Sequence, residues 1–237
     1  MTPKPRVPAG ESAGTPLPRP GVLFRLFALD VRTLAIFRIA LALVLLADLA
    51  IRFTDMNAMY ADDGMFPRDQ IRLRYTSAWN WSLHFLSGSP GFQIALFTLA
   101  AGAGLALLAG CFTRTAAAVS WLLLLSVQHR VPPILNAADG LLRLLLLWGL
   151  FLPLGRAVSV DAWWAGRRGR LLDLRPVLSL ASAGLQLQMA VMYFFSAFFK
   201  STPDWFRGQV IAGSLGHDLY AKPLVKWPFP IRACWPA

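Results

Sequence analysis

The segment LAIFRIALALVLLADLAI, residues 34–51, decides the fold of this chain. It is apolar throughout except for Arg38 and Asp48. A helix of about 20 predominantly apolar residues crosses the hydrocarbon core of a bilayer, and this segment approaches that length. We therefore expect a membrane-spanning helix here, and an integral membrane protein rather than a soluble domain.

Further apolar segments follow along the chain. They cover residues 92–108, 116–127, 141–154 and 177–199. Together with the first segment they predict an all-α fold, a polytopic integral membrane bundle of about five transmembrane helices. Residues 52–90 are polar and rich in aromatic side chains, which is typical of a loop at the headgroup level. We expect this loop to contain a short interfacial helix.

The composition supports the membrane class. Hydrophobic residues make up 56% of the chain, charged residues only 15%, and the mean hydropathy is +0.52. The formal charge of +11 comes mainly from basic residues beside the apolar segments, so we expect anionic lipid headgroups as partners and no nucleic acid. Cys111 and Cys234 are too few for a metal framework, and no metal is expected.

The chain divides into three parts. Residues 1–20 are rich in Pro and Gly with scattered basic residues, and residues 1–29 are predicted to form a disordered cytoplasmic tail. Residues 30–220 form the membrane domain, and residues 221–237 form a C-terminal tail. Basic loops stay in the cytoplasm during insertion, and residues 156–175 carry five arginines. We therefore expect a protein of the plasma (inner) membrane with its N-terminus in the cytoplasm and its C-terminal tail outside.

Ionisable side chains beside apolar segments are the candidates for chemistry, because a charge at the bilayer centre costs about 2.5–3.5 kcal/mol on insertion scales. Arg38 needs an anion or backbone carbonyl groups, and we expect it to tie its helix to a neighbour. Asp139 and Arg143 are four residues apart, on one face of a helix. Either they form an intrahelical ion pair, or Asp139 orients a reacting or binding group at the outer rim of the membrane.

Lys200 closes the last apolar segment, in the sequence MYFFSAFFK (residues 192–200), with Asp204 and Trp205 just beyond. A lysine at the membrane boundary often extends its ammonium group to the lipid headgroups. A lysine surrounded by aromatic side chains can instead act as a general base. Both interpretations stay open on the residues alone.

Several short motifs occur along the chain in a characteristic order. The membrane domain opens with Asp30–Ile39, followed by Asp48 and Arg52. The later motifs are Tyr60–Arg68, Ser82–Phe85, Thr113-Arg114, Arg130, Asn136–Arg143 and Phe151–Gly155. In this order and spacing, the chain resembles the horizontally transferred transmembrane (HTTM) domain family, which includes the vitamin K-dependent gamma-carboxylases. The resemblance implies five or so spans with the N-terminus inside.

The resemblance also implies a role for the end of the last span. In the carboxylases, a lysine after an apolar helix and a Tyr-Phe pair, shortly before Asp-Trp, is the base that deprotonates reduced vitamin K. Tyr193-Phe194, Lys200 and Asp204-Trp205 match this arrangement. Lys200 is thus implied as the catalytic base, and a reduced, vitamin K-like quinone as the cofactor. The residues expected to shape the quinol or substrate site are His129, Arg130, Asn136, Asp139, Arg143, Tyr193, Asp204 and Trp205.

Functions from different classes are compatible with these residues. The first is a membrane enzyme, a carboxylase-like lyase or a quinol- and oxygen-linked oxidoreductase, with Lys200 as base. The carboxylases continue through further membrane segments and an extramembrane domain, so this chain is expected to be either a minimal member of the family or one that needs a partner chain. A lipid-soluble cofactor is the other expected partner. The second is a non-catalytic membrane scaffold or maturation partner whose intramembrane charges are structural. The third is a small transporter subunit, for which broken helices would be expected.

Overall fold

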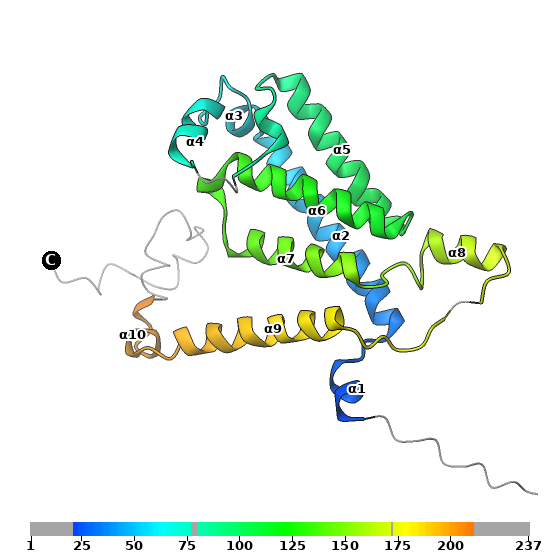
Figure 1. The fold of residues 1–237 in the computed structure, drawn as a ribbon. Coiled ribbons are helices and arrows are strands. Elements are labelled where there is room, and N and C mark those ends of the chain that lie inside the picture. The colour runs from blue at the N-terminus through cyan, green and yellow to red at the C-terminus, as the bar shows by residue number, and fades with distance from the viewer. Residues whose placement is uncertain (1–20, 77–79, 172, 211–237) are drawn as a thin grey trace, which may run out of the picture.

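A computed structural model describes residues 21–76, 80–171 and 173–210 of the protein (Figure 1). In this part of the chain the regular elements are helices, with one isolated bridge between Leu29 and Val177. The helices are α1 (Val22–Phe27), α2 (Val31–Thr54), α3 (Met56–Tyr60), α4 (Arg68–Arg74), η1 (Leu83–Phe85), α5 (Pro90–Ala109), α6 (Thr113–Arg130), η2 (Pro132–Ile134), α7 (Ala137–Phe151), α8 (Val160–Arg167), α9 (Leu180–Phe199) and α10 (Pro203–Phe206). The all-α prediction is confirmed, and the predicted tail at residues 221–237 lies outside the described residues.

Among the described residues, three helices are long and apolar enough to cross a membrane, namely α2, α5 and α9. They correspond to the segments predicted at residues 34–51, 92–108 and 177–199. The other two predicted spans also form helices, α6 and α7, but α6 carries basic residues near both of its ends and α7 has only 15 residues. The structure therefore supports three membrane-spanning helices, and the expected count of about five is not confirmed.

Helix α7 ends before the boundary predicted at residue 154 because Pro153 follows it. A residue that precedes proline disfavours the helical conformation, and Leu152 is extended with ψ 143°. Leu152 and Leu154 are nevertheless fully buried, against Leu34 of α2 and Leu185 of α9. The residues after α7 thus help to attach α9 to the rest of the protein.

Helices α2, α5, α6 and α7 form the packed bundle. α2 packs against α5 and α7, and α6 packs against the same two helices. Each of the four contributes a leucine that is at most 1% exposed, in a cluster of Leu45, Leu107, Leu124 and Leu146. Because lipid chains are as apolar as leucine, such contacts stabilise a membrane bundle through close packing rather than through exclusion of water.

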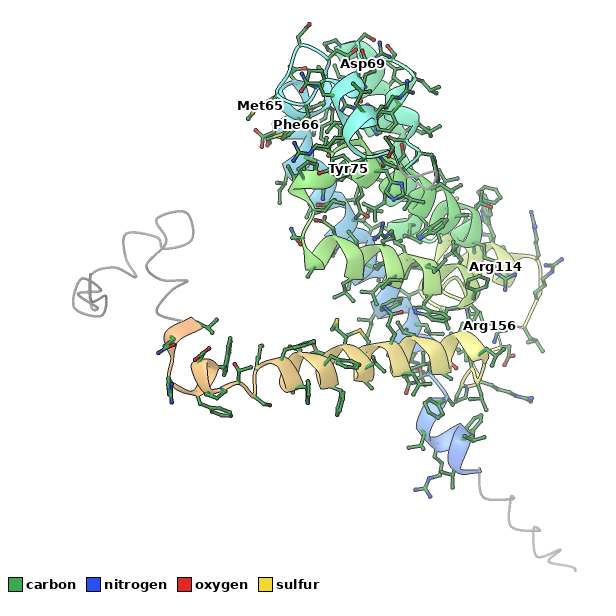
Figure 2. The ribbon with its side chains drawn as sticks, turned by 60° about the vertical axis from the view of Figure 1, so that its left-hand side comes forward. Met65, Phe66, Asp69, Tyr75, Arg114 and Arg156 are labelled. Carbon is green, nitrogen blue, oxygen red and sulfur yellow. The ribbon has the colours of Figure 1, made fainter. Side chains whose placement is uncertain are left out.

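Helix α9 contacts the bundle with its N-terminal half. Trp148 of α7 donates its indole N–H to Gln188, and Gln186 donates to the carbonyl oxygen of Phe27 at 3.3 Å. Figures 1 and 2 show α9 continuing past the end of the bundle. The helix there exposes Val191, Tyr193, Phe194, Phe195, Phe198 and Phe199.

Two segments outside the predicted spans contain short helices. α1 lies within the tail predicted at residues 1–29 and packs against α9, so the prediction of disorder is wrong for residues 22–27. Residues 1–20 lie outside the described part of the chain. The predicted loop at residues 52–90 contains the short helices α3, α4 and η1, and their place at a membrane interface stays a prediction.

Candidate functional site

The bundle has two polar ends, which we call the Arg130 end and the Arg38 end. At the Arg130 end, α2 and α6 end while α5 and α7 begin. At the Arg38 end lie the first turns of α2, the turn between α5 and α6, and the loop after α7. Both arginines are buried, with 0% and 1% of their surface exposed. In Figure 2 the labelled residues Met65, Phe66, Asp69 and Tyr75 lie toward the first end, and Arg114 and Arg156 toward the second.

Arg52, in the last turn of α2, is the centre of an ion-pair network at the Arg130 end. Its Nε donates to Asp48 at 2.9 Å, and its two Nη atoms donate to Asp139 and to the Tyr60 hydroxyl group, the latter at 3.3 Å. Asp48 lies one helical turn earlier, on the same face of α2. One guanidinium therefore joins α2, α3 and α7, and it is paired with carboxylates as its burial requires.

Asp139 also caps α7. The side chain of Asn136 accepts from the N–H of Ala138 at 2.8 Å and from that of Asp139 at 3.3 Å, while Asp139 accepts from the N–H of Asn136 at 2.7 Å. This reciprocal arrangement is a capping box. One oxygen of the Asp139 carboxylate is thus bound to Arg52 and the other to the cap, so both are engaged by the protein itself.

Arg130 ends α6 and holds the segment between α3 and α4. Its Nη atoms donate to the carbonyl oxygens of Phe66 and Tyr60, both at 2.9 Å, and one of them lies 3.9 Å from Asp62. Asp62 in turn forms an ion pair with Arg68 at 2.8 Å. Arg130 therefore fixes the loop over the end of α6 through backbone carbonyl groups.

Lys200 follows the last residue of α9 and is exposed. Its Nζ lies 5.3 Å from the centre of the Trp205 ring, which is a cation–π distance. Asp204 lies beside Trp205 in the first turn of α10, yet no carboxylate of the described residues pairs with Lys200. Tyr193, seven residues before Lys200, is 65% exposed.

Most of the predicted site residues therefore fall into two separate groups. The first group is Arg130, Asn136 and Asp139 at the Arg130 end. The second group is Tyr193, Lys200, Asp204 and Trp205 at the end of α9. Within the described residues no hydrogen bond or ion pair joins the two groups, so the structure does not gather them into one site.

His129 and Arg143 belong to neither group. The His129 ring is within hydrogen-bond distance of the Trp81 carbonyl oxygen, at 3.2 Å, on the outside of the bundle. Arg143 is half-buried, and no ion pair joins it to Asp139 in the described structure, because Arg52 holds the Asp139 carboxylate. The hypothesis of an intrahelical Asp139–Arg143 pair is therefore wrong.

Comparison with known protein families agrees with the helical geometry. A model of the HTTM domain matches residues 27–230, which is most of the chain. The chain belongs to the HTTM domain family. Comparisons with curated proteins and with solved structures find no match. The HTTM domain and the three apolar helices fit an integral membrane protein related to the membrane domain of the carboxylases.

The polar network of this HTTM domain includes residues that were not predicted as site residues. Arg52, Tyr60 and Asp62 belong to the family-like motifs, but their roles are visible only from their contacts. His84 bonds through Nδ1 to Gln93, and Gln93 donates to the carbonyl oxygen of Ser87 at 2.6 Å. Gln93 is fully buried in the first turn of an apolar helix, where a glutamine requires polar partners. The signal for this in the sequence was a glutamine near the start of an apolar segment.

An aromatic cluster covers the network. The ring centres of Tyr60 and Phe97 are 5.2 Å apart, and the His84 ring lies 5.7 Å from Tyr60 and 5.6 Å from Phe97. Burial lowers the pKa of His84 to about 4, so the imidazole is neutral at pH 7. Burial also raises the pKa of Tyr60, whose hydroxyl group stays protonated. These groups therefore act in neutral form.

At the Arg38 end of the HTTM bundle, the arginine ties α2 to the loop after α7, as expected. It donates to the carbonyl oxygens of Leu154 at 3.2 Å and Val158 at 2.6 Å. Asp161 of α8 accepts from the N–H groups of Phe112 and Thr113, both at 2.8 Å. Burial raises the pKa of Asp161, but these bonds and that from the Thr113 hydroxyl group hold it below its ordinary value.

The two ends of the bundle and the end of α9 differ in the chemistry that their charged side chains can carry out. At the two ends of the bundle, the buried charges of Arg38, Arg130 and Asp139 are bound by other groups of the protein. No cluster of three His, Cys, Asp or Glu in the described residues is placed to hold a metal ion. At the end of α9, the Lys200 amine is exposed beside an aromatic surface. A lysine in that position is open to a bound molecule or to the lipid headgroups.

Proposed function

We propose that the protein is a membrane enzyme that acts with a lipid-soluble quinol, with Lys200 as the general base and the α2–α7 bundle as its support. The observation that carries this proposal is the position of Lys200. It ends a helix long enough to span a membrane, it is exposed, and no carboxylate of the described residues neutralises it. Membership of the HTTM family, and the resemblance to the carboxylases, support the same role.

The residues around Lys200 fit a flat aromatic headgroup with an apolar tail. Phe198 and Phe199 are 63% and 70% exposed, and the rings of Phe195 and Phe199 lie 6.2 Å apart. Aromatic side chains bind a ring by offset or edge contacts, and the same helix presents an apolar surface to a tail that lies in the hydrocarbon. A bound quinol supplies an acidic hydroxyl group and reducing electrons.

Each residue of the α9 group has a defined part in this proposal. The Nζ of Lys200, in its neutral form, accepts the hydroxyl proton of the bound quinol. The face of the Trp205 ring then stabilises the resulting ammonium ion. Tyr193 lies two turns earlier on the same face of α9, where its hydroxyl group can hydrogen-bond the bound molecule. Asp204 stabilises the start of α10, since an acidic residue in the first turn favours the helix.

A second function, a non-catalytic membrane scaffold or maturation partner, is favoured by a different observation. Arg52, Asp48 and Asp139 bind one another, and Arg130 and Arg38 bind backbone carbonyl groups. Such charges hold the helices together without taking part in a reaction. Lys200 then serves only to anchor α9 at the headgroups.

Quinol oxidation under oxygen in lipid nanodiscs separates the two functions. If Lys200 is the base, the wild type oxidises quinol, and Lys200→Ala loses that activity. Lys200→Arg does not restore it, because a guanidinium stays protonated and cannot accept a proton. Arg207→Gln is the matched control, since it removes one exposed positive charge seven residues away. Equal background rates in all four folded proteins would support the scaffold instead.

A further inference from the structure

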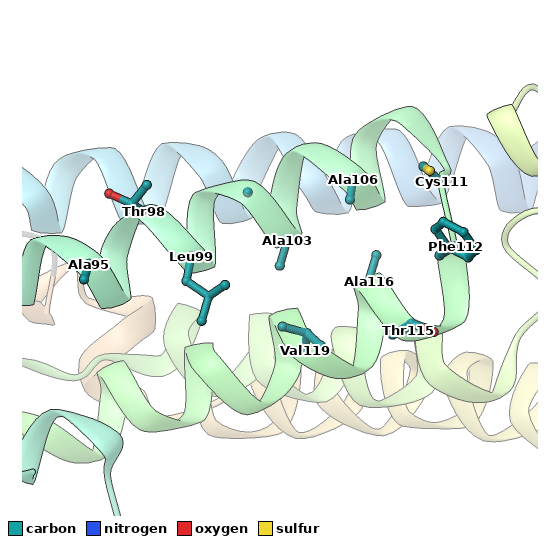
Figure 3. A pocket seen from close by; sticks show the side chains of 11 residues that line it. Ala95, Thr98, Leu99, Ala103, Ala106, Cys111, Phe112, Thr115, Ala116 and Val119 are labelled. Carbon is teal, nitrogen blue, oxygen red and sulfur yellow. The ribbon is translucent and has the colours of Figure 1, made fainter.

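A shallow apolar groove runs between α5 and α6 on the surface of the bundle (Figure 3). Its volume is about 830 Å³, and small side chains such as Ala95, Gly102 and Ala106 line much of it. From Ala95 to Ala106 the helix rises about 16 Å at 1.5 Å per residue. One leaflet contributes about half of the 30 Å hydrocarbon thickness, so the groove has the length of one acyl chain.

At the Arg38 end the groove reaches Phe112. This residue has φ 45°, in the left-handed region that bulky side chains rarely adopt, and it is 65% exposed. The ring centres of Phe112 and Trp164 are 5.8 Å apart, and Asp161 bonds the N–H groups of Phe112 and Thr113. The end of the groove at Phe112 is therefore in contact with Trp164 of α8.

The surface at this end of the groove is basic and aromatic. Trp163 is 53% exposed, and the Arg167 guanidinium lies 4.2 Å from the centre of its ring. Arg114, in the first turn of α6, and Arg168 are also exposed, and no acid of the described residues pairs with Arg114, Arg167 or Arg168. Tryptophan and arginine together are typical of the headgroup level of a membrane.

We propose that this groove and α8 together bind one anionic phospholipid, with an acyl chain along α5 and α6 and the phosphate group at Arg114 and Arg167. The small side chains of the groove accommodate the chain, and the unpaired guanidinium groups complement the phosphate charge. The Trp163 and Trp164 rings lie at the boundary between the two. This binding does not depend on the catalytic role proposed for Lys200.

Native mass spectrometry tests the headgroup part of the proposal. The protein is taken from detergent micelles that contain equal amounts of phosphatidylglycerol and phosphatidylcholine, and the retained lipids are compared. We expect retention of phosphatidylglycerol over phosphatidylcholine, and a fall in that preference of about fivefold for each arginine removed in Arg114→Gln/Arg167→Gln. Arg72→Gln/Arg74→Gln removes the same charge at the Arg130 end and keeps the preference.

Two glycine variants test the acyl-chain part. A Cβ atom added at Gly102 or at Gly91 of α5 meets no protein atom within 4 Å, so both positions have room for the start of a side chain. Gly102→Leu fills the groove and lowers the retention of both lipids, whereas Gly91→Leu, outside the groove, retains them as the wild type does. Equal retention of the two lipids by the wild type, equal losses from both arginine pairs, or full retention by Gly102→Leu would overturn the proposal.

Discussion

The α2–α7 bundle and the second half of α9 differ in the surroundings of their charged groups. In the bundle, Arg130 is buried and Arg52 is half-buried, and both are bound to carboxylates or carbonyl oxygens. At the end of α9, Lys200 is exposed, and an aromatic ring is its neighbour. The comparison shows that the charges most costly to bury serve the architecture, whereas the lysine that the architecture leaves unpaired is available to a ligand.

The largest expected effect on stability is that of Arg130→Met, which tests whether the buried charges of the bundle are structural. The substitution leaves the carbonyl groups of Tyr60 and Phe66 without their side-chain donor, and it removes the weaker of the two arginine contacts of Asp62, whose ion pair with Arg68 remains. Removing one partner of a buried charged contact costs about 3–5 kcal/mol of unfolding free energy. Chemical denaturation in micelles measures the loss. Arg74→Met, an exposed position, is the control, and similar stability of the two variants would contradict the structural role.

The next effect in size is a pH dependence from His84. Its folded pKa of about 4 lies below the ordinary 6.5, so between these values the unfolded chain binds a proton that the folded protein does not. His84 therefore makes its full contribution to the unfolding free energy above pH 6.5. About 3 kcal/mol of unfolding free energy is lost as the pH falls from 6.5 to 4. Unfolding curves recorded over this range for wild type and His84→Gln check it. An unchanged pH slope in the variant would show that His84 is not the group.

A smaller effect is expected for the pair Arg52 and Asp139. Asp139→Asn removes the charge opposite Arg52 but keeps an oxygen for the cap, so we expect a loss of about 2 kcal/mol. A double-mutant cycle with Arg52→Gln measures the coupling between the two residues. The exposed Asp69→Asn serves as the control for loss of an acidic charge. Additive effects of Asp139→Asn and Arg52→Gln would mean that the observed pair does not stabilise the protein.

The smallest effect on stability is expected at Lys200. Because its ammonium group is exposed and is not paired with a carboxylate, Lys200→Gln changes the unfolding free energy by less than about 0.5 kcal/mol. The same denaturation experiment measures it beside Arg130→Met. A loss comparable to that of the bundle arginine would place Lys200 among the structural charges and remove the contrast between the two regions.

The helices were largely predictable from the sequence because a run of apolar residues as long as that in α2 has few alternatives in a membrane. The starts of some helices were also predictable, because residues that favour the N-cap position, such as Asn136, stand immediately before them. Pro153 explains the early end of α7, and α1 was missed because its short apolar stretch stands in a polar tail. The expected count of about five spans is not confirmed in the described residues, because α6 carries basic residues near both ends and α7 has only 15 residues.

The candidate site was less predictable because partner choice is a tertiary property. Asp139 and Arg143 have ideal helical spacing, yet Arg52 of α2 forms the ion pair with the Asp139 carboxylate. His84 and Gln93 bond only because η1 folds against the start of α5. The family resemblance indicated most of the candidate site residues. Their spacing along the chain could not show that Arg130 and Lys200 would lie in separate groups.

The most direct test of the account measures the unfolding temperature and the rate of quinol oxidation on the same nanodisc samples of wild type and Lys200→Gln. The account predicts equal unfolding temperatures and loss of the oxidation rate in the variant, since Lys200 acts on the ligand and not on the fold. An oxidation rate that survives at an equal unfolding temperature would contradict it, and so would a lowered unfolding temperature that accounts for the lost activity.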